Sequence, residues 1–332
     1  HWHGMIVPNY MDGVPGVTQA PMDPGASVFY EYPIRQSGTY WYHSHYELQE
    51  QTGLAGPLII EAKDEPHSYD RDVVVMLSDW LDQAPDTVIP QLRMEQPPPR
   101  RRRCVRPAAW GCRTANHSTS TSTIPATCST ASRTPRPWSL KVRQGERLRL
   151  RILNGSASSF FRVMLEGQSV GSHRRGWPAG DADERVTALC SARAERYDAL
   201  VTIGTSGTFK LHAAALGSND QVVGLIHTTP NAGPANTKPP VFSGTTCGFD
   251  DYAAFKSPFP TTLPEGPVKT FKVDLGGQMN KYLWSMDGMY FPEKYSPDGK
   301  ATPFKISYGD RVRISFTNST MMYHPIHLHG MW

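Results

Sequence analysis

Three histidine clusters constrain the fold of this chain more than any other feature of its sequence. Two lie in the first fifth, at residues 1–4 (HWHG) and 43–45 (HSH), and the third lies at residues 324–330 (HPIHLHG). Alternate residues of a β-strand point to the same face, so each His-x-His pair can place two imidazoles on one side. Neutral imidazole binds copper, zinc, iron and nickel, and several converging pairs can hold more than one ion. We therefore expect a fold that brings both ends of the chain to one metal site.

Turn residues and short apolar runs favour a mostly β fold. The 332 residues include 28 glycines and 29 prolines, which separate short runs rich in Val, Ile, Tyr and Phe. This length allows one to three domains, and no run of about 18 apolar residues predicts a transmembrane helix. The expected helix lies at 82–92, and the expected strands lie at 27–34, 39–45, 56–61, 71–80, 139–143, 147–153, 197–203 and 208–214 (as a hairpin), 269–275, 305–308 and 311–317.

An internal repeat indicates that one domain type occurs more than once. Residues 144–155 (QGERLRLRILNG) echo residues 308–319 (YGDRVRISFTNS). The alternation at 148–152 is typical of an edge or half-buried strand. The repeat predicts duplicated β-sandwich domains.

Two stretches depart from the β pattern, near 97–137 and 171–194. The first holds eight arginines and no acidic residue, so the net charge of +4 comes from this segment and the rest of the chain is net acidic. An arginine run among Pro, Ser and Thr is typical of a solvated segment, and because no aromatic-rich platform for stacking bases accompanies it we expect no nucleic-acid binding. Its cysteines match no usual zinc spacing. We interpret both stretches as local frame-shifted translation, with divergent loops as the alternative.

The histidine motifs resemble those of the multicopper oxidases. Further likeness to the bacterial copper-resistance members of that family comes from residues 11–16 (MDGVPG), 77–80 (LSDW), 282–288 (YLWSMDG) and 321–324 (MMYH). The resemblance implies an all-β chain of three cupredoxin-like Greek-key β-sandwich domains. Their expected bounds are 1–65 for an incomplete first domain, 66–230 for the second, 231–266 for a linker and 267–332 for an incomplete third.

The resemblance also implies which residues bind copper. In the family, one segment of the last motif serves a mononuclear type 1 centre and a cluster made of a type 2 copper and a binuclear type 3 pair. Asp12 matches an acidic residue thought to supply protons to the cluster, and an ordinary turn Asp is the alternative. The implied metal ligands are His324 for type 1, His1 and His327 for type 2, and His3, His43, His45 and His329 for type 3.

The type 1 centre also needs a cysteine between two histidines, and the 332 residues contain no His-Cys-His sequence. A blue site of two His and one Cys cannot form without that thiolate. The chain therefore resembles an internal fragment of a longer oxidase, and we expect it to be inactive or poorly active by itself.

Three functions remain open at this stage. The first is a periplasmic or otherwise exported oxidase that couples one-electron oxidation of cuprous ions, in copper resistance, to reduction of dioxygen to water. The second is a laccase that oxidises phenols, and the third is a non-catalytic protein that sequesters copper. The expected partners are dioxygen and a cuprous or phenolic reductant, with no nucleic acid and no membrane span.

Overall fold

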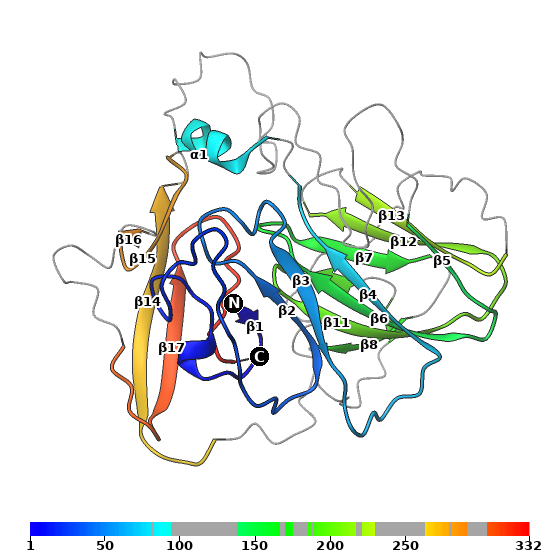
Figure 1. Ribbon diagram of the computed structural model, residues 1–332, viewed down its shortest axis with the longest axis horizontal. Coiled ribbons are helices and arrows are strands. Elements are labelled where there is room, and N and C mark those ends of the chain that lie inside the picture. The colour runs from blue at the N-terminus through cyan, green and yellow to red at the C-terminus, as the bar shows by residue number, and fades with distance from the viewer. Residues whose placement is uncertain are drawn as a thin grey trace. The chain divides into compact units, whose positions relative to one another are not determined.

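The computed structural model describes ten stretches of the chain, which form two compact units. The described residues are 1–80, 83–93, 138–166, 170–174, 185–186, 189–216, 221–229, 263–278, 281–290 and 304–331. The first unit comprises His1–Asp82, Pro107–Pro258 and His327–Trp332, and the second comprises Gln83–Arg106 and Phe259–Ile326. Both ends of the chain thus belong to the first unit, where they lie close together (Figure 1).

The first unit contains three sheets. A three-stranded antiparallel sheet has the order β1 (Trp2–His3), β2 (Gly38–His43) and β3 (Ala55–Ile60), with the short helix η1 (Asn9–Met11) in the loop after β1. One five-stranded sheet has the order β10 (Leu189–Ser191), β7 (Phe161–Leu165), β12 (Thr208–Ala215), β13 (Gln221–His227) and β5 (Ser139–Lys141). The other has the order β4 (Arg71–Leu77), β6 (Arg147–Asn154), β11 (Arg196–Thr202), β8 (Val170–Arg174) and β9 (Arg185–Val186).

The two five-stranded sheets pack face to face as a β-sandwich. Leu150 and Ile152 from β6 share one buried cluster with Phe161 and Val163 from β7 and with Leu211 from β12. A smaller cluster joins Trp41 of β2 to Met76 and Leu153, which anchors the histidine-bearing sheet to the sandwich.

The second unit is a four-stranded sheet with one helix. Its strand order is β16 (Met289–Tyr290), β15 (Leu283–Met286), β14 (Val268–Gln278) and β17 (Arg311–Asn318), and the helix is α1 (Pro85–Arg93). Among the described residues, no helix is long and apolar enough to cross a membrane.

The sequence repeat is also a structural repeat. Strand β6 pairs in parallel with β4, and β17 pairs in parallel with β14 (Figure 1). Both repeat strands end on an asparagine whose Oδ1 accepts a hydrogen bond from the backbone N–H two residues later, at 3.1 Å for Asn154 and 2.9 Å for Asn318. In each case the residue after the asparagine donates its backbone N–H to a leucine carbonyl on the parallel neighbour, Leu77 in one copy and Leu275 in the other.

An almost entirely β architecture is confirmed, but several predicted elements are wrong. Residues 27–34 and 305–308 form no strand, and the predicted hairpin of 197–203 with 208–214 does not exist. β11 pairs with β6 and β8, whereas β12 pairs with β7 and β13, because the chain crosses from one sheet of the sandwich to the other. Period-two alternation identifies a strand but carries no information about its partner.

Strand β6 is also not an edge strand, because it lies between β4 and β11 and is buried on both faces. Its charged face is buried by acidic partners: Arg151 pairs with Asp72, and Arg149 with Asp198.

The two anomalous stretches are described only in part. Residues 97–137 lie outside the described residues. Within 171–194, contrary to the absence of strand pattern in the sequence, β8, β9 and β10 occur, and β8 pairs with β11 at Tyr197↔Arg174.

Candidate metal centre

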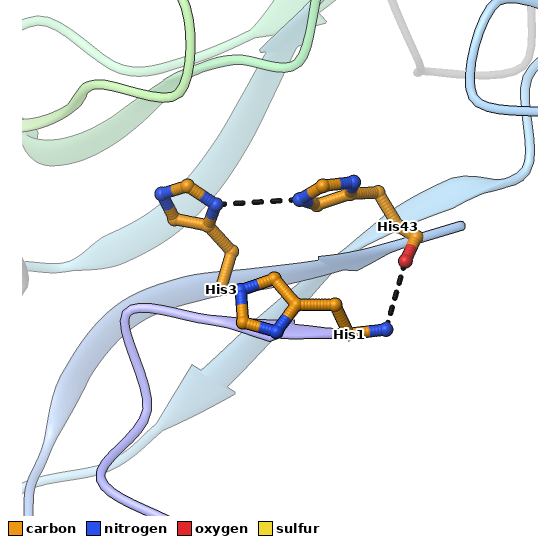
Figure 2. Close-up of side chains that lie close together, drawn as sticks. All are labelled: His1, His3 and His43. Atoms are coloured by element: carbon orange, nitrogen blue, oxygen red, sulfur yellow. Dashed lines mark hydrogen bonds between the residues drawn. The ribbon is translucent and has the colours of Figure 1, made fainter. Parts of the chain in front are cut away.

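The backbone of β1 and β2 places His1, His3 and His43 together (Figure 2). The two strands are antiparallel, with His3 opposite Trp41. Just beyond this ladder, the amino group of His1 donates to the carbonyl of His43 at 2.9 Å, and the N–H of His43 donates to the carbonyl of His1 at 3.1 Å. His3 Nδ1 then lies 3.3 Å from His43 Nε2, so the two rings face each other across the strand pair.

The other histidines reach the same place from irregular segments. His45 follows the end of β2, and residues 324–330 contain no strand, so the predicted strand geometry of the HPIHLHG motif is wrong. Its two last histidines nevertheless stack on the first motif, His327 on His3 and His329 on His1, each with ring centroids 3.8 Å apart. The ring of His45 lies 4.9 Å from those of His43 and His329.

Six of the seven predicted metal ligands therefore form one cluster within the first unit. The ligand atoms of His1, His3 and His43 all lie within 4.8 Å of one another, and those of His1, His327 and His329 do likewise. Both groups share His1, so the arrangement offers room for more than one ion.

Unpartnered nitrogen atoms in the cluster fit a site that binds a metal. The buried Nε2 atoms of His1, His45 and His327 have no hydrogen-bond partner among the described residues. A buried polar atom without a partner costs roughly 1–3 kcal/mol, so three in one place are unusual unless a ligand satisfies them. Imidazole nitrogens that converge on one another offer lone pairs, which a cation accepts.

Asp12 contacts two of these rings at their Nδ1 atoms. Its Oδ1 lies 3.1 Å from His1 Nδ1, and its Oδ2 lies 2.7 Å from His329 Nδ1. Asp12 is only 5% exposed, and it is placed by the turn at the end of η1, where its N–H bonds the carbonyl of Asn9. A carboxylate that accepts from Nδ1–H leaves Nε2 as the free lone pair, the usual arrangement around a metal-binding histidine.

Burial keeps three of the imidazoles neutral. Desolvation, followed by the nearby charges of His327 and Arg196, holds the pKa of His3 well below its ordinary value. Desolvation and neighbouring histidines lower the pKa of His45 to about 4, and desolvation, His329 and Arg196 lower that of His327 to about 4. At neutral pH these rings are unprotonated, which is the form that binds a metal.

Several contacts around the cluster had no signal in the sequence. Trp41 stacks on His43 with centroids 4.3 Å apart, and Glu50 Oε2 lies 3.5 Å from His43 Nδ1. Arg193, which precedes β11, forms an ion pair with Glu50, with Nη2 of the arginine 2.7 Å from Oε2 of the glutamate. Because Glu50 and Arg193 lie 143 residues apart in the sequence, only the fold could reveal their contact.

His324, the seventh predicted ligand, belongs to the second unit. Its Nε2 lies 2.7 Å from the hydroxyl of Thr320, and its ring lies 5.9 Å from that of Trp284. No cysteine among the described residues lies beside His324. The one described cysteine, Cys190, belongs to the first unit and is disulfide-bonded.

Family models agree with this arrangement along almost the whole chain. Three models described as multicopper oxidase match residues 1–65, 71–233 and 266–332. The chain belongs to the multicopper oxidase family. Each histidine cluster falls inside a matched range, the first two in 1–65 and the third in 266–332.

Similar curated proteins include copper-resistance members of the family. The chain is 29% identical to the copper resistance protein A homolog of Pseudomonas syringae pv. tomato, over 100% of this chain and 73% of that protein. It is 32% identical to the multicopper oxidase MmcO of Mycobacterium tuberculosis, over 99% of this chain and 64% of that protein. Laccase-1 of Cryptococcus neoformans is 34% identical over 50% of this chain.

Solved multicopper oxidases share the fold. The laccase from Botrytis aclada superposes with a TM-score of 0.64 at 23% identity, covering 87% of this chain and 53% of that one. The multi-copper oxidase from Pseudomonas thermotolerans superposes with a TM-score of 0.62 at 21% identity, and the match covers 99% of this chain and 70% of that one. These likenesses establish a cupredoxin-type β fold.

Proposed function

We propose that the six clustered histidines of this multicopper oxidase are ligands of a trinuclear copper centre that reduces dioxygen to water. The observation that carries the proposal is the set of three buried Nε2 atoms, unpartnered among the described residues, within one cluster of six imidazoles. The family uses type 1, type 2 and type 3 copper centres. In this proposal His1 and His327 hold the type 2 ion, and His3, His43, His45 and His329 hold the type 3 pair.

Bound copper would supply the redox chemistry, taking electrons one at a time and passing four to dioxygen. The residues of the chain fix the ligands and their spacing. Asp12 contacts the Nδ1 atoms of His1 and His329, which leaves their Nε2 atoms to serve as ligands, and its carboxylate would carry a proton toward the site. His324 is the proposed ligand of the type 1 centre in the second unit.

Cuprous ion is the proposed electron donor. Three similar proteins are named for copper resistance, two in Pseudomonas syringae and one in Escherichia coli, and the chain matches them over its full length. A laccase activity on phenols is the second candidate, because Laccase-1 of Cryptococcus neoformans matches half of the chain. Export to the periplasm accompanies the first proposal. The division into domains at 1–65, 66–230 and 267–332 also stays a proposal.

Copper binding by the purified chain tests the site, and oxygen uptake by the longest available form of the protein tests the activity. We expect copper to bind the chain with histidine-nitrogen ligands visible by electron paramagnetic resonance. Oxygen consumption stimulated by cuprous ion but not by a phenol supports the copper-resistance function, and the reverse supports a laccase. Copper binding without oxygen consumption from either donor would favour a non-catalytic copper-sequestering protein.

A further inference from the structure

Arg196, at the start of β11, reaches across to the histidine-bearing strands. It is 5% exposed, and its Nε donates to the carbonyl of Thr39 on β2 at 3.0 Å. Its Nη1 donates to the carbonyl of Ala194 at 3.2 Å, and its guanidinium carbon lies 5.7 Å from the centre of the Tyr40 ring. One planar group is therefore fixed to its own loop and to the strand that carries His43.

The same guanidinium also lies against the segment that carries His1 and His3. A Cβ at Gly4 would lie 2.6 Å from Arg196 Nη2, which is closer than real Cβ contacts allow. Gly4 has φ +81°, a left-handed conformation that favours glycine. Gly4 directly follows His3, so the glycine of the HWHG motif serves both the turn and the close approach of Arg196.

Asp198, on the same face of β11, makes a second hydrogen bond to β2. Its Oδ1 accepts from the hydroxyl of Thr39 at 2.6 Å, while its Oδ2 accepts from Arg149 at 2.5 Å. Residues two apart on a strand point to the same side. Thr39 is thus held by its carbonyl through Arg196 and by its side chain through Asp198, and it is completely buried.

We propose that Arg196 is a positioning residue, which locks the segment of His1 and His3 and the strand of His43 at the spacing that the copper cluster needs. This inference rests on the proposed copper site. Lysine cannot replace arginine here, because three different guanidinium nitrogens meet Thr39, Ala194 and Gly4, whereas the single ammonium nitrogen of lysine cannot occupy all three positions at once. A role limited to holding the two sheets together would predict loss of stability without a change at the histidines.

The test compares Arg196→Lys and Arg196→Met with matched substitutions of Arg71. Arg71 likewise bridges two segments, although through one carbonyl and one carboxylate: it bonds Lys141 O at 2.7 Å and Glu146 at 2.6 Å, and it belongs to β4 rather than to the histidine strands. Two readouts are measured: contacts between the His3 and His43 rings by nuclear magnetic resonance in the copper-free chain, and copper affinity with its paramagnetic resonance spectrum.

We expect Arg196→Lys to weaken copper binding at least about tenfold, as changes around metal ligands do. It should also alter the spectrum and weaken the His3–His43 ring contact, while Arg71→Lys leaves all three unchanged. Copper affinity, spectrum and ring contact equal to those of the unchanged chain in Arg196→Lys would overturn the proposal, even if its melting temperature falls. If Arg196→Met fails to fold, Arg196→Lys alone decides.

The same experiment separates the two proposals. If the unchanged chain binds no copper, the proposed function fails. The copper-free ring contact still decides the positioning role, because its persistence in Arg196→Lys contradicts that role and its loss supports it.

Discussion

Asp12 illustrates how one carboxylate can prepare two ligands. Each of its oxygens faces one Nδ1 atom, that of His1 at 3.1 Å and that of His329 at 2.7 Å, although the two histidines lie at opposite ends of the chain. The sequence left a choice between a proton carrier and an ordinary turn residue. The geometry supports a role at the site, because a turn residue alone would not need to face both rings.

Asp12→Asn should therefore weaken copper retention. An amide offers a single oxygen acceptor, so it can orient only one of the two rings, and loss of such partners typically costs about 10- to 100-fold in metal affinity. Dialysis against a copper chelator of known affinity measures the change. Asp23→Asn, at an exposed position of the same long loop, is the control and should bind as the unchanged chain does. Equal copper affinity in both variants would contradict the assignment.

The last motif offers a comparison between two of its own histidines. His327 stacks on His3 and has a buried, unpartnered Nε2 among the described residues, whereas His324 contacts Thr320 and Trp284 in the second unit. We expect His327→Ala to lose about one copper ion per chain and His324→Ala to keep the copper of the cluster. Metal analysis after gel filtration gives the stoichiometry. Retention of all copper in His327→Ala would remove it from the ligand set.

At the scale of elements, β2 carries both a core residue and a proposed copper ligand. Trp41 is fully buried against Met76 and Leu153, and its ring stacks on His43 at 4.3 Å. The next residue, Tyr42, is 41% exposed on the opposite face of the strand. The alternation along one strand thus separates a core residue from a surface residue and places His43 on the core side.

Trp41→Ala should destabilise the chain and disturb the site together. Loss of a buried Trp typically costs about 3–5 kcal/mol of unfolding free energy. Urea denaturation measures that cost, and Tyr42→Ala should cost much less because the tyrosine is half exposed. If Trp41→Ala unfolds at the same urea concentration as Tyr42→Ala, the packing of β2 on the sandwich is not as described.

The sequence predicted elements well where alternation was clear and failed where tertiary contacts decided. β3, β6, β14 and β17 lie close to their predicted bounds, and the repeat correctly related β6 to β17. Residues 27–34 alternate equally well, but Tyr30 and Tyr32 contact Trp2 through their rings instead of joining a sheet. Pairing partners and loop packing depend on distant residues, which local patterns do not encode.

The residues of the candidate site likewise divide into those that the sequence predicted and those that only the fold revealed. The family motifs supplied all six clustered histidines and Asp12. They gave no indication of Glu50, Arg193 or Arg196, which act through contacts between segments far apart in sequence. Nor did they predict that His327 and His329 would reach the cluster from a segment without strand structure.

At the scale of the whole molecule, the positions of the cysteines determine which visible absorption bands the copper-bound chain can show. None of its five cysteines lies between two histidines, so no thiolate is available in the usual blue-copper arrangement. Copper titration of the chain should give histidine-type signals without an intense visible thiolate band. Appearance of that band would mean that a cysteine outside the Cys190 disulfide has been recruited as a ligand.

Copper should also stabilise the fold of the chain as a whole. The six histidines come from residues 1–3, 43–45 and 327–329, so they converge only when both ends of the chain are in place. A ligand that binds only the folded state stabilises it by about 2.7 kcal/mol at a free concentration of 100 times its Kd. We expect the melting temperature to fall when a chelator removes copper, and to recover when copper is restored. The double variant His327→Ala/His329→Ala lacks the ligands that tie the C-terminal segment to β1, so the chelator should shift its melting temperature much less. A chelator effect of equal size in the double variant would show that copper stabilises the chain from another site.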